Sequence, residues 1–322
     1  MPKLLLAAAI LSFTACLDPA ADGNLVPRTA DEDPSIPQLS FNGSTFHVET
    51  FGDPSAPVIV MLHGGPGGDY RGLLRLRDPV NGVRLEDHHL LVFWDQRGCG
   101  LSRRHPANEI TPEAYDLDLT WIIDHFSPGR PVVLLGHSWG GMYATRYISM
   151  HPDKVAGAVL MEPGPLTGAL FDELKPEMFD LDPTAEWLND YAWAQTIVSP
   201  DGHARADYLR GIGLFGALQP NYHQSTTDRE PFWRMGAVAA AAIPEADPHW
   251  DFTRGLDRFG APVLFEASEE NTVIGRAFQE RQMRFFPSAR LLVIAGAGHD
   301  FPWTRAPQSV AGVLSYLDSI AY

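Results

Sequence analysis

The sequence predicts an α/β protein with a mostly parallel central sheet, helices on both faces and an inserted helical lid. Short apolar segments bounded by turn residues alternate with longer segments of helical periodicity. The apolar segments are nearly continuous, which is typical of strands covered on both faces. This alternation stops between Pro163 and about Leu256, where a long helical stretch rich in aromatic residues intervenes. We interpret that stretch as the lid.

The predicted elements follow one another along the chain. Strand candidates are rich in β-branched or aromatic residues and lie at 57–62, 89–94, 131–135, 155–161, 262–265 and 290–294. Helix candidates with apolar periodicity lie at 112–126, 140–151, 274–286 and 307–320. The predicted core therefore comprises residues 38–162 and 257–322, with residues 163–256 as the lid.

Composition narrows the class of protein. The formal net charge of −16 argues against a nucleic-acid or anionic-membrane surface, both of which require clustered Lys and Arg. No group of His and carboxylate residues has metal-ligand spacing, so we expect no metal and no other cofactor. The expected partner is a small molecule or a short peptide, and the oligomeric state is left open.

The N-terminus is typical of an export signal. Residues 1–15 combine one Lys, an apolar run and small residues, and the run is too short for a stable membrane-spanning helix. Residues 13–16 (FTAC) resemble a bacterial lipobox, which implies lipidation of Cys16 and, with Leu17 after it, an outer-membrane location. A plain signal peptide is the alternative. Residues 16–37, rich in Asp, Pro and Ala, are expected to form a flexible tether.

A Gly-rich turn separates the strand at 131–135 from the helix that follows. Residues 136–140 read GHSWG and match the G-x-S-x-G nucleophile elbow, in which glycines permit a strained turn that projects the serine hydroxyl. Ser138 is the candidate nucleophile. His137, although adjacent in sequence, is expected to point away from the tip of the elbow.

Two more loops complete the candidate site. Residues 63–68 (HGGPGG) follow a predicted strand, so the backbone N–H groups of Gly65 and Trp139 could form an oxyanion hole, with His63 ordering the turn. Residues 295–299 (AGAGH) follow the last predicted strand and place a histidine after the serine in chain order. His299 is therefore the candidate general base.

Residues 95–102 (DQRGCGLS) are expected to fix the loops around the site through an Asp95–Arg97 ion pair, with Cys99 as a small buried residue. Together with HGGPGG and GHSWGG, this segment resembles the motifs of the proline iminopeptidase (peptidase family S33) branch of the α/β-hydrolase superfamily. The resemblance runs from about Leu39 to the end of the chain. It implies the α/β-hydrolase fold and a cofactor-free serine hydrolase that works through an acyl-enzyme.

The third member of the triad is ambiguous. In most relatives an Asp follows the seventh strand, but the matching position here is Asn271, which carries no charge. Glu270 and Glu269 lie beside it, whereas Glu162 closes the apolar run at 155–161, where some haloalkane dehalogenases of the superfamily keep their acid. We favour Glu162, with Glu270 as the alternative and Glu269 behind it.

Substrate choice is expected to depend on the lid. Iminopeptidases hold the free N-terminal amine of the substrate with lid carboxylates near a W-x-x-W-E segment; here Trp193 is present, but Gln195 replaces the acid. Candidate amine anchors are Glu186, Asp190 and Glu230, although an ordinary solvated charge is the default interpretation of each. The specific hypothesis is a proline iminopeptidase-like aminopeptidase. A carboxylesterase or lactonase is the second hypothesis, and a non-catalytic binding lipoprotein is the third.

Overall fold

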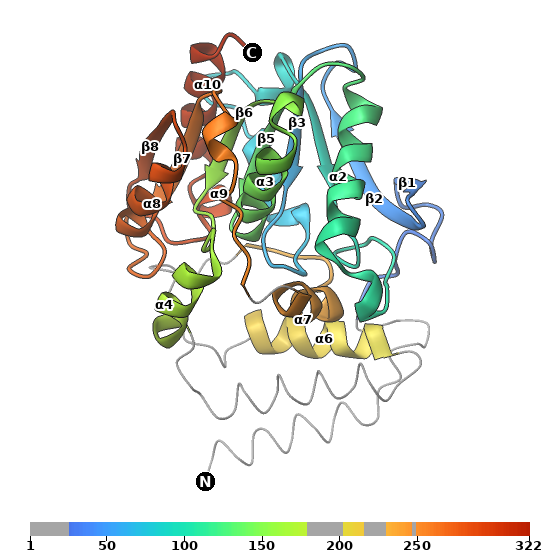
Figure 1. Ribbon diagram of the computed structural model, residues 1–322. Coiled ribbons are helices and arrows are strands. Elements are labelled where there is room, and N and C mark those ends of the chain that lie inside the picture. Colours follow the sequence, from blue (N-terminus) through green and yellow to red (C-terminus); the bar gives the residue numbers. More distant parts are fainter. Residues whose placement is uncertain (1–25, 179–201, 216–229, 247–248) are drawn as a thin grey trace.

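The computed structural model describes residues 26–178, 202–215, 230–246 and 249–322 (Figure 1). Within these ranges an eight-stranded sheet has the order β1-β2-β4-β3-β5-β6-β7-β8. Strand β2 pairs in antiparallel fashion with both β1 and β4, and all later neighbours in this order pair in parallel. The predicted α/β-hydrolase fold is confirmed. The strands are β1 (Gln38–Phe41), β2 (Ser44–Phe51), β3 (Val58–Leu62), β4 (Leu90–Trp94), β5 (Val132–His137), β6 (Val155–Met161), β7 (Val263–Ser268) and β8 (Ala289–Ile294).

Helices cover both faces of the sheet. On one face α2 (Pro112–Phe126) and α3 (Trp139–Met150) pack through buried residues such as Leu119 and Tyr143. On the other face lie the 3₁₀ segment η1 (Tyr70–Arg77) and α10 (Ala306–Ser319), together with α9 (Phe301–Thr304). All five residues of β3 and of β4 are buried, as the near-continuous apolar runs predict.

Three α-helices lie in the described parts of the segment between β6 and β7. These are α4 (Gly168–Met178), α6 (Gly202–Phe215) and α7 (Ala237–Ala246), which lie together at one end of the sheet, at the bottom of Figure 1. The backbone N–H of Gly236, directly before α7, donates to Gly67 O at 2.7 Å. Asp207 of α6 accepts hydrogen bonds from Arg104, Arg234 and the backbone of Ala237. Helices α6 and α7 are thus tied to the loops after β3 and β4. Helix α8 (Arg276–Gln282) follows β7.

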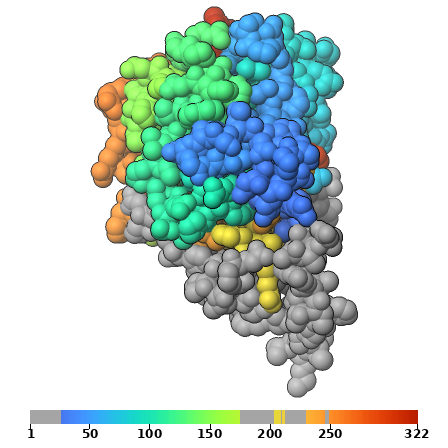
Figure 2. Space-filling view, turned by 90° about the vertical axis from the view of Figure 1, so that its right-hand side faces the viewer, coloured from blue at the N-terminus to red at the C-terminus, as the bar shows by residue number. Residues whose placement is uncertain are grey.

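The expectation of a flexible tether over residues 16–37 is wrong from residue 26 onward. Val26 and Ala30 are buried, the backbone N–H of Ala30 donates to Leu101 O at 2.7 Å, and Arg234 donates to Pro27 O at 2.8 Å. In Figure 2 the blue surface, which contains this segment together with β1 and β2, lies against the rest of the molecule. Residues 1–25, with the expected signal and Cys16, lie outside the described residues.

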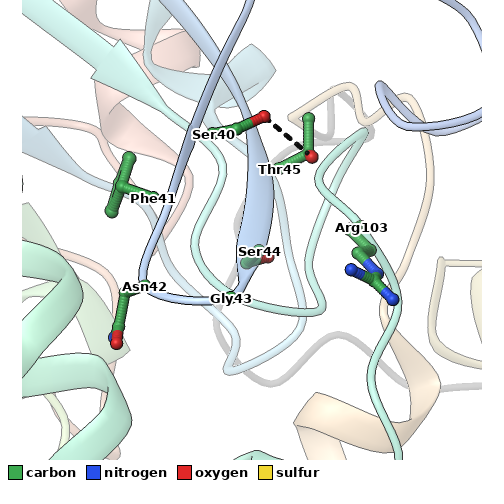
Figure 3. Close-up of a pocket in the computed structure, with 7 residues that line it drawn as sticks. All are labelled: Ser40, Phe41, Asn42, Gly43, Ser44, Thr45 and Arg103. Carbon is green, nitrogen blue, oxygen red and sulfur yellow. Dashed lines mark hydrogen bonds between the residues drawn. The ribbon is translucent and has the colours of Figure 1, made fainter.

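A surface pocket lies at the turn between β1 and β2, and Figure 3 shows its lining. The hydroxyl groups of Ser40 and Thr45 are 3.1 Å apart across this hairpin, and Arg103 stands at its edge. Strands β4 and β3 separate β2 from β5, and none of the predicted site residues lines this pocket.

A carboxyl group lies in the core between β7 and α10. Glu266 is fully buried, its Oε2 accepts a hydrogen bond from the Ser309 hydroxyl, and its Oε1 has no hydrogen-bond partner among the described residues. Burial raises the pKa of Glu266 from 4.5 to about 8, with the Ser309 hydrogen bond opposing the shift. The folded protein therefore holds this proton at pH values where the unfolded chain releases it.

This buried acid predicts a pH-dependent stability. The pKa of Glu266 is higher in the folded protein than in the unfolded chain. Its contribution to the free energy of unfolding is therefore complete below about pH 4.5 and is lost as the pH rises through about 8, at roughly 1.4 kcal/mol per pH unit. We expect Glu266→Gln to reduce the fall in Tm between pH 5 and pH 8.5 by on the order of 5 °C. The exposed Glu113→Gln is the control. Parallel Tm curves for wild type and Glu266→Gln would contradict the assignment.

Candidate active site

Strand β5 ends at His137, and α3 begins at Trp139, which leaves Ser138 alone at the turn. Its backbone has φ 54° and ψ −118°, a conformation that side-chain-bearing residues rarely adopt. The flanking glycines make the turn possible. A Cβ at Gly136 would lie 2.3 Å from Gly140 O, and a Cβ at Gly140 would lie 1.9 Å from Leu62 O. The strained turn lifts Ser138 out of the otherwise buried strand, and its side chain is partly exposed.

The carboxylate of Glu162 lies against the ring of His299. His299 Nδ1 is 2.6 Å from Glu162 Oε2, and because an ionised carboxylate only accepts, Nδ1 carries the proton in this pair. Glu162 directly follows β6 and, like Ser138, is a non-glycine residue with a positive φ, at 45°. Backbone strain at both Ser138 and Glu162 marks these positions as ones held in place by their surroundings.

Three further donors hold Glu162. Its Oε1 accepts from the backbone N–H of Ser268 at 2.9 Å and from the Ser268 hydroxyl at 2.6 Å, and its Oε2 accepts from Asn271 Nδ2 at 2.9 Å. Burial raises the pKa of Glu162, while these hydrogen bonds oppose the shift because they favour the ionised form. Burial also lowers the pKa of His299 to about 4, so its imidazole is neutral at neutral pH.

The two other candidate acids lie elsewhere. Glu269 and Glu270 are exposed, and the Glu269 carboxylate accepts from the backbone N–H of Gly296 at 2.8 Å. Asn271, which occupies the usual place of the acid, donates to Glu162 instead. Of the three candidates, the structure places Glu162 in hydrogen-bond contact with His299.

His137 connects the elbow to the histidine loop. Its Nε2 is 2.9 Å from His299 O, and since a carbonyl oxygen only accepts, Nε2 carries the proton. The two rings pack with centroids 4.6 Å apart. His137 immediately precedes Ser138, so this contact brings the loop of His299 to the elbow. Burial lowers the pKa of His137 to about 3, and its Nδ1 has no hydrogen-bond partner among the described residues.

The loop after β3 also lies against Ser138. A Cβ at Gly64 would stand 3.3 Å from Ser138 Cβ, so the HGGPGG backbone passes directly over the elbow. Gly65 and Trp139, the two expected oxyanion donors, therefore belong to adjoining segments. His63 orders its own turn, as expected, because its Nδ1 is 2.9 Å from Gly64 O.

The expected ion pair between Asp95 and Arg97 is wrong. Arg97 instead forms a bidentate pair with Asp118 of α2, with both N–O distances at 2.8 Å. Asp95 accepts from the backbone of Tyr70 and from His47 Nδ1, at 3.0 and 2.8 Å. Cys99 is buried as expected, and burial raises the pKa of its thiol to about 12, which keeps it from acting as a nucleophile.

An acidic group lies next to the elbow. The Glu230 carboxylate approaches His137 Nδ1 at 3.9 Å, and the backbone N–H of Glu230 is 3.4 Å from Asp300 Oδ2. Burial, with the neighbouring charges of Asp300 and Asp69, raises the pKa of Glu230 well above its usual value. Glu230 is one of the residues expected from the sequence, whereas Asp300 is not, although it directly follows His299. The other candidate lid residues, Glu186, Asp190 and Trp193, lie outside the described residues.

There is no group of three or more His, Cys, Asp or Glu residues arranged to hold a metal ion in the part of the chain that the structure describes. No helix among the described residues has the length and apolar character needed to cross a membrane.

Comparison with known proteins gives the family. A family model described as alpha/beta hydrolase fold matches residues 57–306, and the chain belongs to this family. Its resemblance to the proline iminopeptidase branch is also confirmed. A proline iminopeptidase from Arabidopsis thaliana is 36% identical over 119 residues, which cover 36% of this chain and 29% of that protein. The matches to the first three curated relatives cover 32%, 29% and 42% of those proteins.

Solved structures show the same fold. The proline iminopeptidase of Mycobacterium smegmatis has a TM-score of 0.60 at 20% identity, covering 88% of this chain and 97% of that one. A thermophilic esterase from Thermogutta terrifontis has a TM-score of 0.59 at 21% identity, with the same coverage. A proline iminopeptidase and an esterase thus both share the fold of this chain.

Proposed function

We propose that this protein is a serine hydrolase in which Ser138 attacks a carbonyl carbon, His299 acts as the general base and Glu162 orients the imidazole. The observation that carries the proposal is the pairing of His299 Nδ1 with Glu162 at 2.6 Å, beside a serine held in a strained elbow. With Nδ1 protonated by this pairing, Nε2 is left as the nitrogen that accepts the Ser138 proton.

The chemistry proceeds in two stages. Attack by Ser138 Oγ places a negative charge on the former carbonyl oxygen, which the backbone N–H groups of Gly65 and Trp139 would stabilise. His299 takes the Ser138 proton and returns it to the leaving amine or alcohol, which leaves an acyl-enzyme. Water then attacks the ester carbon with His299 again acting as base, and Ser138 is released.

The low pKa of His299 predicts the acid limb of the pH profile. Protonated His299 cannot accept the Ser138 proton, so activity is lost as the pH falls through the pKa of about 4. We expect kcat/KM to be essentially unchanged from pH 7.5 to pH 6 and to fall steeply toward pH 4. A profile of kcat/KM against pH checks this; a half-maximal value at or above the ordinary histidine pKa of about 6.5 would contradict it.

For the substrate, we propose cleavage of a short peptide or amide with a free N-terminal amine, as the names of the iminopeptidase relatives suggest. The acidic group of Glu230, Asp300 and Asp69 supports this, because an ammonium group bound beside these carboxylates would favour their ionised forms. His137 Nδ1, an acceptor without a hydrogen-bond partner among the described residues, faces the same place.

A carboxylesterase or lactonase is the second candidate. The fold is shared with a solved esterase, and the raised pKa of Glu230 favours the protonated form of this acid when no cation is bound. A neutral Glu230 beside the elbow would suit an uncharged ester.

Three matched substrates separate the two candidates: a prolyl amide of a chromogenic amine, its N-acetyl counterpart and a short-chain ester of the corresponding phenol. If an anionic site holds the amine, we expect turnover of the free prolyl amide and loss of at least about tenfold in kcat/KM on acetylation. Glu230→Gln should then raise KM for the prolyl amide alone. Cleavage of the ester with neither amide consumed would contradict the aminopeptidase assignment and support the esterase.

A further inference from the structure

One buried amide joins the two segments that carry the expected oxyanion donors. Gln96 follows β4 by two positions and has no exposed surface. Its Nε2 donates to His63 O at 3.0 Å, and its Oε1 accepts from the indole Nε1 of Trp139 at 3.0 Å. His63 begins the loop after β3, whereas Trp139 begins α3, so the Gln96 side chain bridges parts of the chain that are distant in sequence.

A second contact fixes the orientation of His63. The backbone N–H of Gln96 donates to His63 Nε2 at 3.0 Å, which requires Nε2 to be unprotonated and places the ring proton on Nδ1. That Nδ1–H is then the donor to Gly64 O, 2.9 Å away. Burial lowers the pKa of His63, in agreement with a neutral ring. Gln96 thus contacts the peptide group on the N-terminal side of Gly64 and, through His63, the one on its C-terminal side.

The base of this arrangement is rigid. Asp95, next to Gln96, is fully buried and accepts from Tyr70 N, Leu101 N and His47 Nδ1 at 3.0, 2.7 and 2.8 Å. Gln96 therefore projects from a backbone position held on several sides. A fixed second layer of this kind is what keeps catalytic donors within a few tenths of an ångström of their working positions.

We propose that Gln96 is a positioning residue that holds the Gly64–Gly65 loop and Trp139 at the spacing an oxyanion requires. The proposal rests on the proposed function, since it assigns Gly65 N–H and Trp139 N–H as the donors. Glutamine suits the task because His63 O can only accept and Trp139 Nε1 can only donate, and one neutral amide satisfies both. Glutamate at this position would place an oxygen against His63 O.

The test compares a substrate with its thiocarbonyl counterpart. Sulfur is a weaker hydrogen-bond acceptor and forms a longer bond to carbon, so an intact oxyanion hole favours the carbonyl substrate over the thiocarbonyl one. The probes are the better substrate from the comparison above and its thioamide or thionoester. We expect Gln96→Met to lower kcat for the carbonyl substrate at least about tenfold with KM within about threefold, and to reduce the carbonyl-to-thiocarbonyl ratio of kcat/KM.

Gln282→Met is the matched control. Gln282 is equally buried and its amide also bridges loop segments, donating to Pro163 O and Gly164 O and accepting from Leu166 N. Its replacement removes the same kind of contacts away from the oxyanion loops, so the carbonyl-to-thiocarbonyl ratio should stay at the wild-type value. A general loosening of the fold would move both variants alike.

Gln96→Glu and Trp139→Phe provide the test if Gln96→Met does not fold, because each removes one end of the bridge while keeping most of the side-chain volume. A wild-type ratio in these variants would overturn the proposal. Trp139→Phe should also have a smaller effect in the Gln96→Met background than in the wild type, because the effects of two residues that act through one contact do not add. An equal effect in both backgrounds would likewise overturn the proposal. Failure of the proposed function looks different: the wild-type enzyme itself would then show no preference for the carbonyl substrate.

Discussion

Replacing Ser138 by alanine is expected to lower kcat by at least about 10⁴-fold without unfolding the protein. Alanine keeps the Cβ in the strained conformation at φ 54° and removes only the hydroxyl, so the elbow and the packing of α3 should persist. The remaining groups, including His299, would have no nucleophile to activate. Steady-state hydrolysis of the best substrate measures the loss, and circular dichroism with thermal melting reports the fold.

Ser149→Ala is the matched control for this variant. Ser149 lies near the other end of the same helix α3, and its hydroxyl donates to Arg146 O rather than to anything in the site. It should keep wild-type kinetics. Turnover by Ser138→Ala at more than a few per cent of the wild-type rate would exclude the serine mechanism.

Glu162→Gln is expected to have the second largest effect, a fall in kcat of about 10³- to 10⁴-fold. The side-chain amide of glutamine is neutral, whereas the carboxylate of Glu162 is negatively charged. The amide therefore no longer stabilises the imidazolium or fixes the proton on His299 Nδ1. The donors that now hold Glu162, from Ser268 and Asn271, would also face a neutral group. The measurement is kcat for the two variants and the wild type across pH.

Glu270→Gln serves as the control, because its exposed side chain was the alternative acid. It should retain activity within about twofold. A larger loss in Glu270→Gln than in Glu162→Gln would reverse the assignment of the acid and would imply that His299 turns toward Glu270 during the reaction.

The fold and much of the site follow from short-range patterns. The apolar runs of β3 and β5, each ended by glycines, specify where the strands stop, and within the elbow itself a Cβ at Gly136 would lie 2.3 Å from Gly140 O, which leaves no room for another residue. Such features are local, so the sequence alone identifies the elbow around Ser138 and the loop that ends in His299.

The pairing of His299 with Glu162 depends on contacts between distant segments. Strand β6 pairs with β7, and the backbone N–H of Glu162 donates to Glu266 O at 2.7 Å, which brings Glu162 and Asn271 to the same edge of the sheet. The sequence shows a carboxylate at the end of one strand and an amide at the usual acid position. It cannot show that the amide donates to the carboxylate.

The two incorrect expectations also concern contacts between segments that are distant in sequence. Asp95 and Arg97 are close in sequence, but the fold brings Arg97 against Asp118 of α2 and surrounds Asp95 with donors from β2 and η1. The polar N-terminal segment was expected to stay free because of its composition. Two buried apolar residues, Val26 and Ala30, with a few backbone hydrogen bonds are enough to dock it.

The most direct test of the account is capture of the acyl-enzyme. The protein is mixed with a chromogenic ester or amide substrate, quenched in acid within the first turnover, digested and mapped by mass spectrometry. We expect a single acyl group on the peptide that contains Ser138, a burst of chromophore equal to the enzyme concentration, and neither signal in Ser138→Ala. Turnover with no adduct, or an adduct on a different side chain, would contradict the proposed mechanism.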